Sequence, residues 1–264
     1  ANSEELIPDG HLLESSMARI SVADEVFTAH AIYKGVTYSS TAVIKNDSLY
    51  YLDEGFNKLI ETIITTPGSV AFVRNDSCTE YFDTQEDFFS KYGIRELNEQ
   101  EVTNLKTVQK LNQYPVTHSI TGNYQNAYNQ MQDDDMAYVG LFDDKYFSDT
   151  HLYLHLKDPL EIQDISHMKS VGLNDKVSSL MIRYNMDDRE ACALLEVWED
   201  SYFNHEDNDR TKHRTYFMAS YVQSTNAVGD LKKVSCFHAH DSWNDRISSI
   251  SFHIGYIDSL PDEY

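Results

Sequence analysis

Two stretches of Asn, Asp and Ser residues carry the clearest chemical signal in this 264-residue chain. The hexapeptide Asn174-Asp175-Lys176-Val177-Ser178-Ser179 returns seventy positions later as Asn244-Asp245-Arg246-Ile247-Ser248-Ser249. Such self-similarity within one chain indicates a duplicated structural unit. The Asn, Asp and Ser side chains all offer oxygen, the ligand atom that a hard divalent cation such as calcium prefers. The repeat therefore predicts two cation-binding loops.

Short strands are expected to position these loops. Val177 and Ile247 alternate with polar neighbours, which is typical of a strand with one face packed into a sandwich. Segments that are aromatic or β-branched and bounded by Asn, Asp, Ser or Gly predict strands along most of the chain. These segments are residues 26–31, 37–44, 69–74, 138–142, 151–156, 179–184, 193–198, 215–222, 233–238 and 247–254. Helices are expected only at 96–111 and, for a turn or two, at 85–92.

Both hexapeptides resemble the calcium-binding signature of the βγ-crystallin superfamily. That signature is two Asn/Asp, a variable residue, an aliphatic residue, Ser/Thr and then Ser, and both copies match it throughout. The second hallmark of that family is an aromatic residue, four spacers, another aromatic, one residue and a glycine. Two such pairs precede the hexapeptides without the glycine: Phe142 and Phe147 followed by Asp149, and Trp198 and Phe203 followed by His205. Asp and His tolerate the positive φ that such a corner needs.

The resemblance implies an all-β fold built from Greek-key sandwich domains, in which two motifs exchange loops so that both hold each ion. It implies that the variable residue and the residue after the first aromatic supply carbonyl oxygens, and that Asn, Asp and Ser supply side-chain oxygens. The implied calcium ligands are Asn174, Asp175, Lys176, Ser178, Asn244, Asp245, Arg246, Ser248, Asp143 and Glu199.

Fainter copies suggest the same architecture in the N-terminal half. Residues 55–63 keep the frame of apolar and hydroxyl positions, and residues 99–105 echo it more weakly. Lys58 and Glu61 replace an acidic residue and a hydroxyl in the first copy, so any metal site there is expected to be weak or lost. The expected domains are a polar leader (1–17), a diverged βγ-crystallin-like domain (18–110), a linker (111–135) and a calcium-binding domain (136–258).

The charge balance limits the partners. Asp and Glu outnumber Lys and Arg by 43 to 21, giving a formal charge of −22, which disfavours nucleic acid and anionic membranes. No apolar run approaches the roughly 18 residues of a membrane span. We therefore expect a non-enzymatic, secreted or extracytosolic calcium-binding protein with a protein target. The alternative is a secreted effector of the protease-inhibitor or toxin type on the same fold.

Other side chains leave further alternatives open. His238 and His240, with His205 or His213, have the types needed for a transition-metal site if 238–240 is a strand. Cys192 and Cys236 fall in the same half and are candidates for a disulfide, while Cys78 makes the cysteine count odd. Cys236 near His238 also allows a thiol nucleophile, although no oxyanion-hole motif accompanies it.

Overall fold

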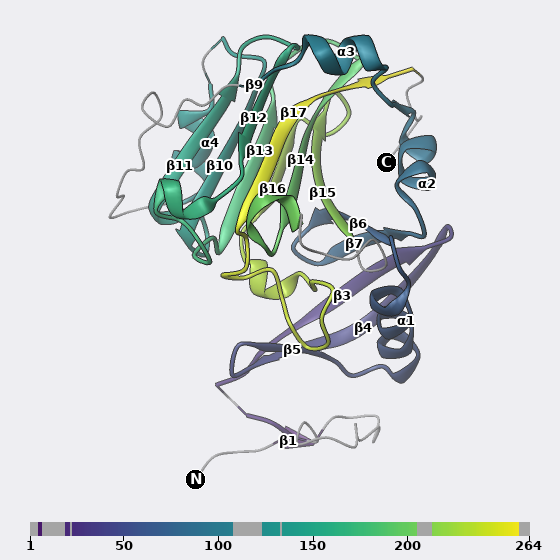
Figure 1. Cartoon of the computed structure of the whole chain (residues 1–264). Coiled ribbons are helices and arrows are strands. Elements are labelled where there is room, and N and C mark those ends of the chain that lie inside the picture. Colours follow the sequence, from purple (N-terminus) through teal and green to yellow (C-terminus); the bar gives the residue numbers. More distant parts are fainter. Residues whose placement is uncertain are drawn as a thin grey trace.

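The computed structural model describes residues 5–6, 19–21, 23–107, 123–132, 134–204 and 213–258 (Figure 1). Most ordered elements are strands, and two large sheets dominate the molecule. Within the described ranges, no helix combines the length and the apolar character that a bilayer crossing requires. The strands β1 (Glu5–Leu6) and β2 (Arg19–Ile20) form a separate antiparallel pair within and beside the expected leader.

The C-terminal half contains two consecutive four-stranded motifs. The first motif comprises β10 (Ala137–Asp144), β11 (Ser148–Leu156), β12 (Glu161–Ile165) and β13 (Ser179–Tyr184). The second motif comprises β14 (Ala191–Trp198), β15 (Arg214–Ser220), β16 (Thr225–Val228) and β17 (Ser249–Ile257). Short 3-10 helices, η1 (Met168–Val171), η2 (Ser201–Asn204) and η3 (Leu231–Lys233), lie in the connections.

The third strand of each motif crosses to the sheet of the other motif. One sheet has the order β11-β10-β13-β16, and the other contains β15-β14-β17-β12. The two motifs are therefore interlocked, and the predicted all-β, Greek-key sandwich class is confirmed. Val177 and Ile247 are fully buried in the core between the sheets.

The central strands of the sandwich are covered on both faces, which explains why β10, β13, β14 and β15 are buried along almost their whole length. In β10, Val139 and Leu141 face the sandwich core, while Tyr138 and Phe142 face the opposite side. There they pack against α4 (Tyr124–Gln130), a helix within the expected linker. On the other sheet, α2 (Gln85–Tyr92) packs its buried Phe88 and Tyr92 against the outer side chains of β14 and β15.

The N-terminal half extends the second sheet instead of forming a separate sandwich. Its strands are β3 (Glu25–Tyr33), β4 (Val36–Lys45), β5 (Ser48–Tyr51), β6 (Val70–Asn75), β7 (Cys78–Phe82), β8 (Ile94–Arg95) and β9 (Lys106–Thr107). The order β5-β4-β3-β7-β6 continues through a parallel pairing of β6 with β15. Asn226, which is fully buried, donates Nδ2 to Val73 O (3.1 Å) and Met218 O (3.2 Å), and so joins β16 to this junction.

The prediction that residues 55–63 and 99–105 form Greek-key loops is wrong, because both segments are helical. Residues 55–63 lie in α1 (Glu54–Thr65), where Asp53 accepts a hydrogen bond from Phe56 N (2.8 Å) as the N-cap. Phe56, Ile60 and Ile63 are buried on one face, so the apolar period is that of a helix. Residues 99–105 contain α3 (Glu99–Asn104).

Of the two helices expected from the sequence, one is confirmed and the other is shorter than expected. The short helix expected at 85–92 is confirmed as α2. The helix expected at 96–111 is shorter: α3 is followed directly by β9, and residues 108–111 lie outside the described part of the chain. Residues 111–122 of the expected linker also lie outside it. The domain boundaries at 18–110, 111–135 and 136–258 stay a prediction.

Candidate metal site

Each hexapeptide forms a loop that leads into the last strand of its motif. The first loop precedes β13 and the second precedes β17. Asp175 has φ 52° and Asp245 has φ 57°, so both acidic residues adopt the left-handed conformation. Asp is among the few non-glycine residues that tolerate this conformation. The same residue type thus serves the backbone turn and supplies a carboxylate.

The two loops contact each other reciprocally. Ser178 Oγ donates to Asp245 Oδ1 (3.1 Å), and Ser248 Oγ donates to Asp175 Oδ1 (2.9 Å). The backbones repeat this pattern, because Asp175 N donates to Ile247 O (3.3 Å) and Asp245 N donates to Val177 O (3.1 Å). Side chains that are about seventy positions apart in the sequence are therefore brought together in two matching pairs.

The final serine of each hexapeptide holds the aromatic corner upstream. Ser179 Oγ donates to Asp144 O (2.7 Å) and accepts from Phe147 N (3.0 Å). Ser249 Oγ donates to Asp200 O (2.6 Å) and accepts from Phe203 N (3.1 Å). Both serines are fully buried, so they fix the corners from inside the protein.

The corners bring further oxygen atoms close to the loops. Asp143 lies at a register shift between β10 and β11, and Glu199 follows the end of β14 directly. Asp149 has φ 69°, which fits its expected role in place of the family's glycine. His205, the expected counterpart in the second corner, lies outside the described residues.

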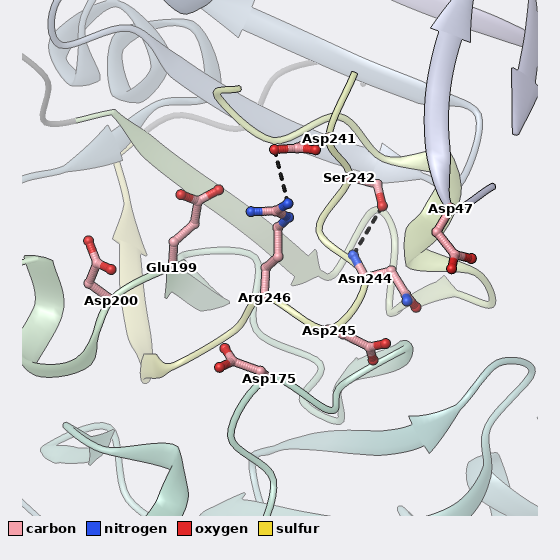
Figure 2. A pocket seen from close by; sticks show the side chains of 9 residues that line it. All are labelled: Asp47, Asp175, Glu199, Asp200, Asp241, Ser242, Asn244, Asp245 and Arg246. Carbon is pink, nitrogen blue, oxygen red and sulfur yellow. Dashed lines mark hydrogen bonds and ion pairs between the residues drawn. The ribbon is translucent and has the colours of Figure 1, made fainter. Parts of the chain in front are cut away.

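An open cavity of about 500 Å³ lies beside the second loop (Figure 2). Its described lining residues are Asp47, Asp175, Glu199, Asp200, Asp241, Ser242, Asn244, Asp245 and Arg246. Figure 2 shows Arg246 reaching from the loop toward Asp241, with Nη2 and Oδ2 2.9 Å apart. Glu199 Oε2 lies 2.7 Å from His238 Nε2.

Five expected ligands line this cavity and five do not. Asp175, Glu199, Asn244, Asp245 and Arg246 line it. The other five are Asn174, Lys176 and Ser178 of the first loop, Asp143 of its corner, and Ser248 of the second loop. Lining residues that the sequence did not assign to the calcium site are Asp47, Asp200, Asp241 and Ser242. None of these belongs to the repeated hexapeptide, so no spacing signal pointed to them.

Burial affects the Asp245 carboxylate of the second loop and the Asp143 carboxylate of the first corner. Burial is the largest cause that raises the pKa of Asp245, while the Ser178 hydroxyl and Lys232 lower it and Asp47 raises it. Burial also raises the pKa of Asp143, and the Asp149 and Asp245 carboxylates raise it further. Partly desolvated acids that repel one another favour the approach of a cation.

The ligand atoms available at the two loops suit a hard cation better than a soft one. The reciprocal pairs and the corner carbonyls offer oxygen only, and Asn174 Oδ1 is buried without a hydrogen-bond donor among the described residues. Across the described part of the chain, no group of three or more His, Cys, Asp and Glu side chains has an arrangement that could hold a metal ion. An ion here therefore needs hydroxyl, amide and carbonyl oxygens besides the carboxylates.

The histidine and cysteine alternatives are corrected by the structure. Residues 238–240 form a turn rather than a strand, so His238 and His240 are not on one strand face. His240 stacks on Tyr50 (ring centroids 4.5 Å apart), and His213 stacks on Phe237 (4.2 Å). Among the described residues, His238, His240 and His213 do not form a group that could hold a metal ion.

The disulfide considered from the sequence is not formed, because all three cysteines are free. Cys192 and Cys236 lie in different hydrophobic clusters. Burial raises the pKa of Cys236 far above the ordinary thiol range, which opposes its use as a nucleophile.

Comparisons with known proteins find one similar solved structure. No family model and no curated protein matches the chain. One solved structure, described as "Evolution of the eye lens beta-gamma-crystallin domain fold", matches with 17% identity and a TM-score of 0.29. The match covers 54% of this chain and 99% of that one. The fold assignment therefore rests on the observed strand order and loop exchange.

Proposed function

We propose that this protein binds calcium at two positions, each formed by both hexapeptide loops. Ser178 and Asp245, with the carbonyls of Lys176 and Asp143, form one ligand set. Ser248 and Asp175, with the carbonyls of Arg246 and Glu199, form the other. Asn174 and Asn244 flank the two carboxylates and complete the oxygen-rich surroundings.

The reciprocal serine–aspartate pairs are the observation that carries this proposal. Two neighbouring ligands of one calcium ion, each about 2.4 Å from it and about 72–90° apart as in a pentagonal bipyramid, lie about 2.8–3.4 Å from each other. The Ser178–Asp245 and Ser248–Asp175 oxygen pairs are 3.1 and 2.9 Å apart. Each pair can therefore turn toward one ion with little movement of the backbone.

We further infer that residues 136–256 are a βγ-crystallin superfamily domain. The supporting observation is the exchange of β12 and β16 between the sheets, together with two complete copies of the signature. The strand exchange places the loops of the two motifs beside each other, and the signature supplies their oxygen atoms.

The proposed role of calcium is to stabilise a non-enzymatic recognition module outside the cytosol. Extracellular modules bind calcium with Kd values of about 0.1–1 mM, and cytosolic calcium leaves such sites mostly empty. At a calcium concentration about 100-fold above Kd, one occupied site adds about 2.7 kcal/mol to the free energy of unfolding. A protein in a calcium-rich setting would gain this stability at each site.

Isothermal titration calorimetry with calcium chloride tests the proposal. We expect the wild type to bind calcium and the Asp175→Ala, Asp245→Ala double variant to lose binding, because each set loses its carboxylate. Asp187→Ala is the matched control, since Asp187 is exposed in the loop at the other end of β13. Absence of binding heat and of any calcium-dependent rise in Tm for the wild type would refute the proposal.

A further inference from the structure

A turn from the N-terminal half reaches the rim of the calcium cavity. Among the described residues that line this cavity, Asp47 alone comes from before β10. Asp47 and Asn46 form the two-residue turn between β4 and β5, where Lys45 pairs with Ser48. Their φ values are 65° and 50°, which is the geometry of a type I′ hairpin turn. The backbone conformation of the turn is therefore well defined.

Contacts between the two halves hold this turn at the cavity. Leu49 N, in β5, donates to His240 O (2.9 Å), and the Tyr50 ring stacks on the His240 ring. The Tyr51 hydroxyl also hydrogen-bonds Ser235 Oγ. Figure 1 shows β5 beside the segment that connects β16 to β17. That segment ends in the second hexapeptide loop, so the contacts of β5 with the segment also restrain the position of the loop.

Asp47 also neutralises a lysine close to the site. Lys232 Nζ, in η3, lies 2.7 Å from Asp47 Oδ1. Lys232 and Asp47 both act electrostatically on Asp245, with opposite signs. A bare ammonium at this position would repel a divalent ion bound at Asp245, whereas the ion pair has no net charge.

We propose that Asp47 is a positioning residue of the calcium site, which raises calcium affinity at Asp245 by neutralising the Lys232 ammonium. The inference rests on the proposed calcium binding and extends it to the N-terminal half, which contributes none of the signature residues. It also makes the coupling reciprocal: calcium at the Asp245 set stabilises the β4–β5 turn as much as the turn favours calcium.

The expected size of the effect follows from Coulomb's law. A unit charge about 8 Å from a divalent ion in a water-like dielectric changes the binding constant about fivefold. Salt screens such an exposed interaction strongly, so the effect should fade at about 1 M ionic strength. Asn tolerates the left-handed conformation as well as Asp does, so Asp47→Asn removes the charge and keeps the turn.

Calcium titration of the full chain at low ionic strength tests this inference. We expect Asp47→Asn to weaken calcium binding about fivefold and Lys232→Gln to strengthen it about fivefold. The double variant should return close to the wild-type Kd. Glu25→Gln is the matched control, because Glu25 Oε1 forms a similar pair with Lys233 Nζ (3.3 Å) away from the cavity lining.

The outcomes separate this inference from the proposed function. If the wild type binds calcium but Asp47→Asn and Lys232→Gln both bind it with the wild-type Kd, the role of Asp47 is overturned and the calcium site stands. The same conclusion holds if Asp47→Asn tightens binding. If the wild type binds no calcium, both proposals fail together. Hydrogen exchange supplies a second readout, since calcium should slow exchange in β5 of the wild type more than in Asp47→Asn.

Discussion

Replacing two adjacent serines one at a time should separate ion binding from folding. Ser178 and Ser179 have the same side chain and follow one another in the first loop, but their hydrogen bonds serve different ends. Ser178 Oγ donates to a carboxylate of the other loop, and Ser179 Oγ holds the aromatic corner. We expect Ser178→Ala to weaken calcium binding and Ser179→Ala to lower the calcium-free stability.

The magnitude follows from what each substitution leaves behind. Ser179→Ala leaves the N–H of the buried Phe147 without its partner, whereas Asp144 is exposed and its carbonyl can be solvated by water. A buried unsatisfied group costs about 1–3 kcal/mol, so we expect a loss of about 2 kcal/mol in the free energy of unfolding. Ser178→Ala removes a hydrogen bond to the Asp245 carboxylate, but Asp245 is exposed and water can replace the lost donor. Its cost should be about 1 kcal/mol or less.

Urea unfolding in EGTA measures both stabilities, and calorimetry then measures calcium affinity. For a chain of this length, a loss of about 2 kcal/mol corresponds to a fall in Tm of about 4–8 °C. The equivalent pair Ser248→Ala and Ser249→Ala should reproduce the contrast. Equal stability losses for Ser178→Ala and Ser179→Ala in EGTA would contradict the assigned division of roles.

Three further predictions follow from buried groups. Burial raises the pKa of Glu196 from 4.5 to about 7, so its folded-state stabilisation is present below pH 4.5 and is lost as pH rises through 7. Urea unfolding across pH 4.5 to 7 should therefore show a loss of about 3 kcal/mol in the wild type that is absent in Glu196→Gln. The same pH-dependent loss in both proteins would contradict this prediction. Asn226→Ala should lower the free energy of unfolding by about 2 kcal/mol, because the carbonyl of Val73 loses its donor; thermal melts with wild-type Tm would refute this. Cys192 and Cys236 are free and buried, so they should react with a thiol reagent only after unfolding, and reductant should leave Tm unchanged.

The sequence predicted most strands and both loops of the C-terminal half because its local patterns agree there with the tertiary structure. The strand expected at 233–238 is wrong, because Leu231–Lys233 is a 3-10 helix and Ser235 forms only an isolated bridge, and β12 and β16 were missed. Asp175 and Asp245 satisfy a left-handed turn and offer carboxylates, so the residue type reveals both roles. The N-terminal copy at 55–63 misled the interpretation because apolar and hydroxyl residues fit a helix and a strand equally well over a short window. The N-cap at Asp53 was the available signal for the helix.

Asp47 and Asp241 could not be placed at the cavity from the sequence. Asp47 is 128 positions before Asp175, and no repeated spacing connects the two. Asp47 reaches the rim only because β5 lies at the end of an extended sheet and contacts the turn at His240. Such contacts depend on the register and twist of many strands, which local residue patterns do not specify.

By itself, the sequence determined the chemistry of the loops: oxygen-bearing residues repeated in a frame that fixes which of them turn the backbone and which end up buried. Only the tertiary structure decided which loops meet. The crossing of β12 and β16 sets Ser178 against Asp245 and Ser248 against Asp175, and the pairing of β6 with β15 draws the N-terminal half into the same sheet. The reason is physical: side-chain type acts within a few residues, whereas strand pairing joins segments from the whole chain so that the central strands are buried on both faces.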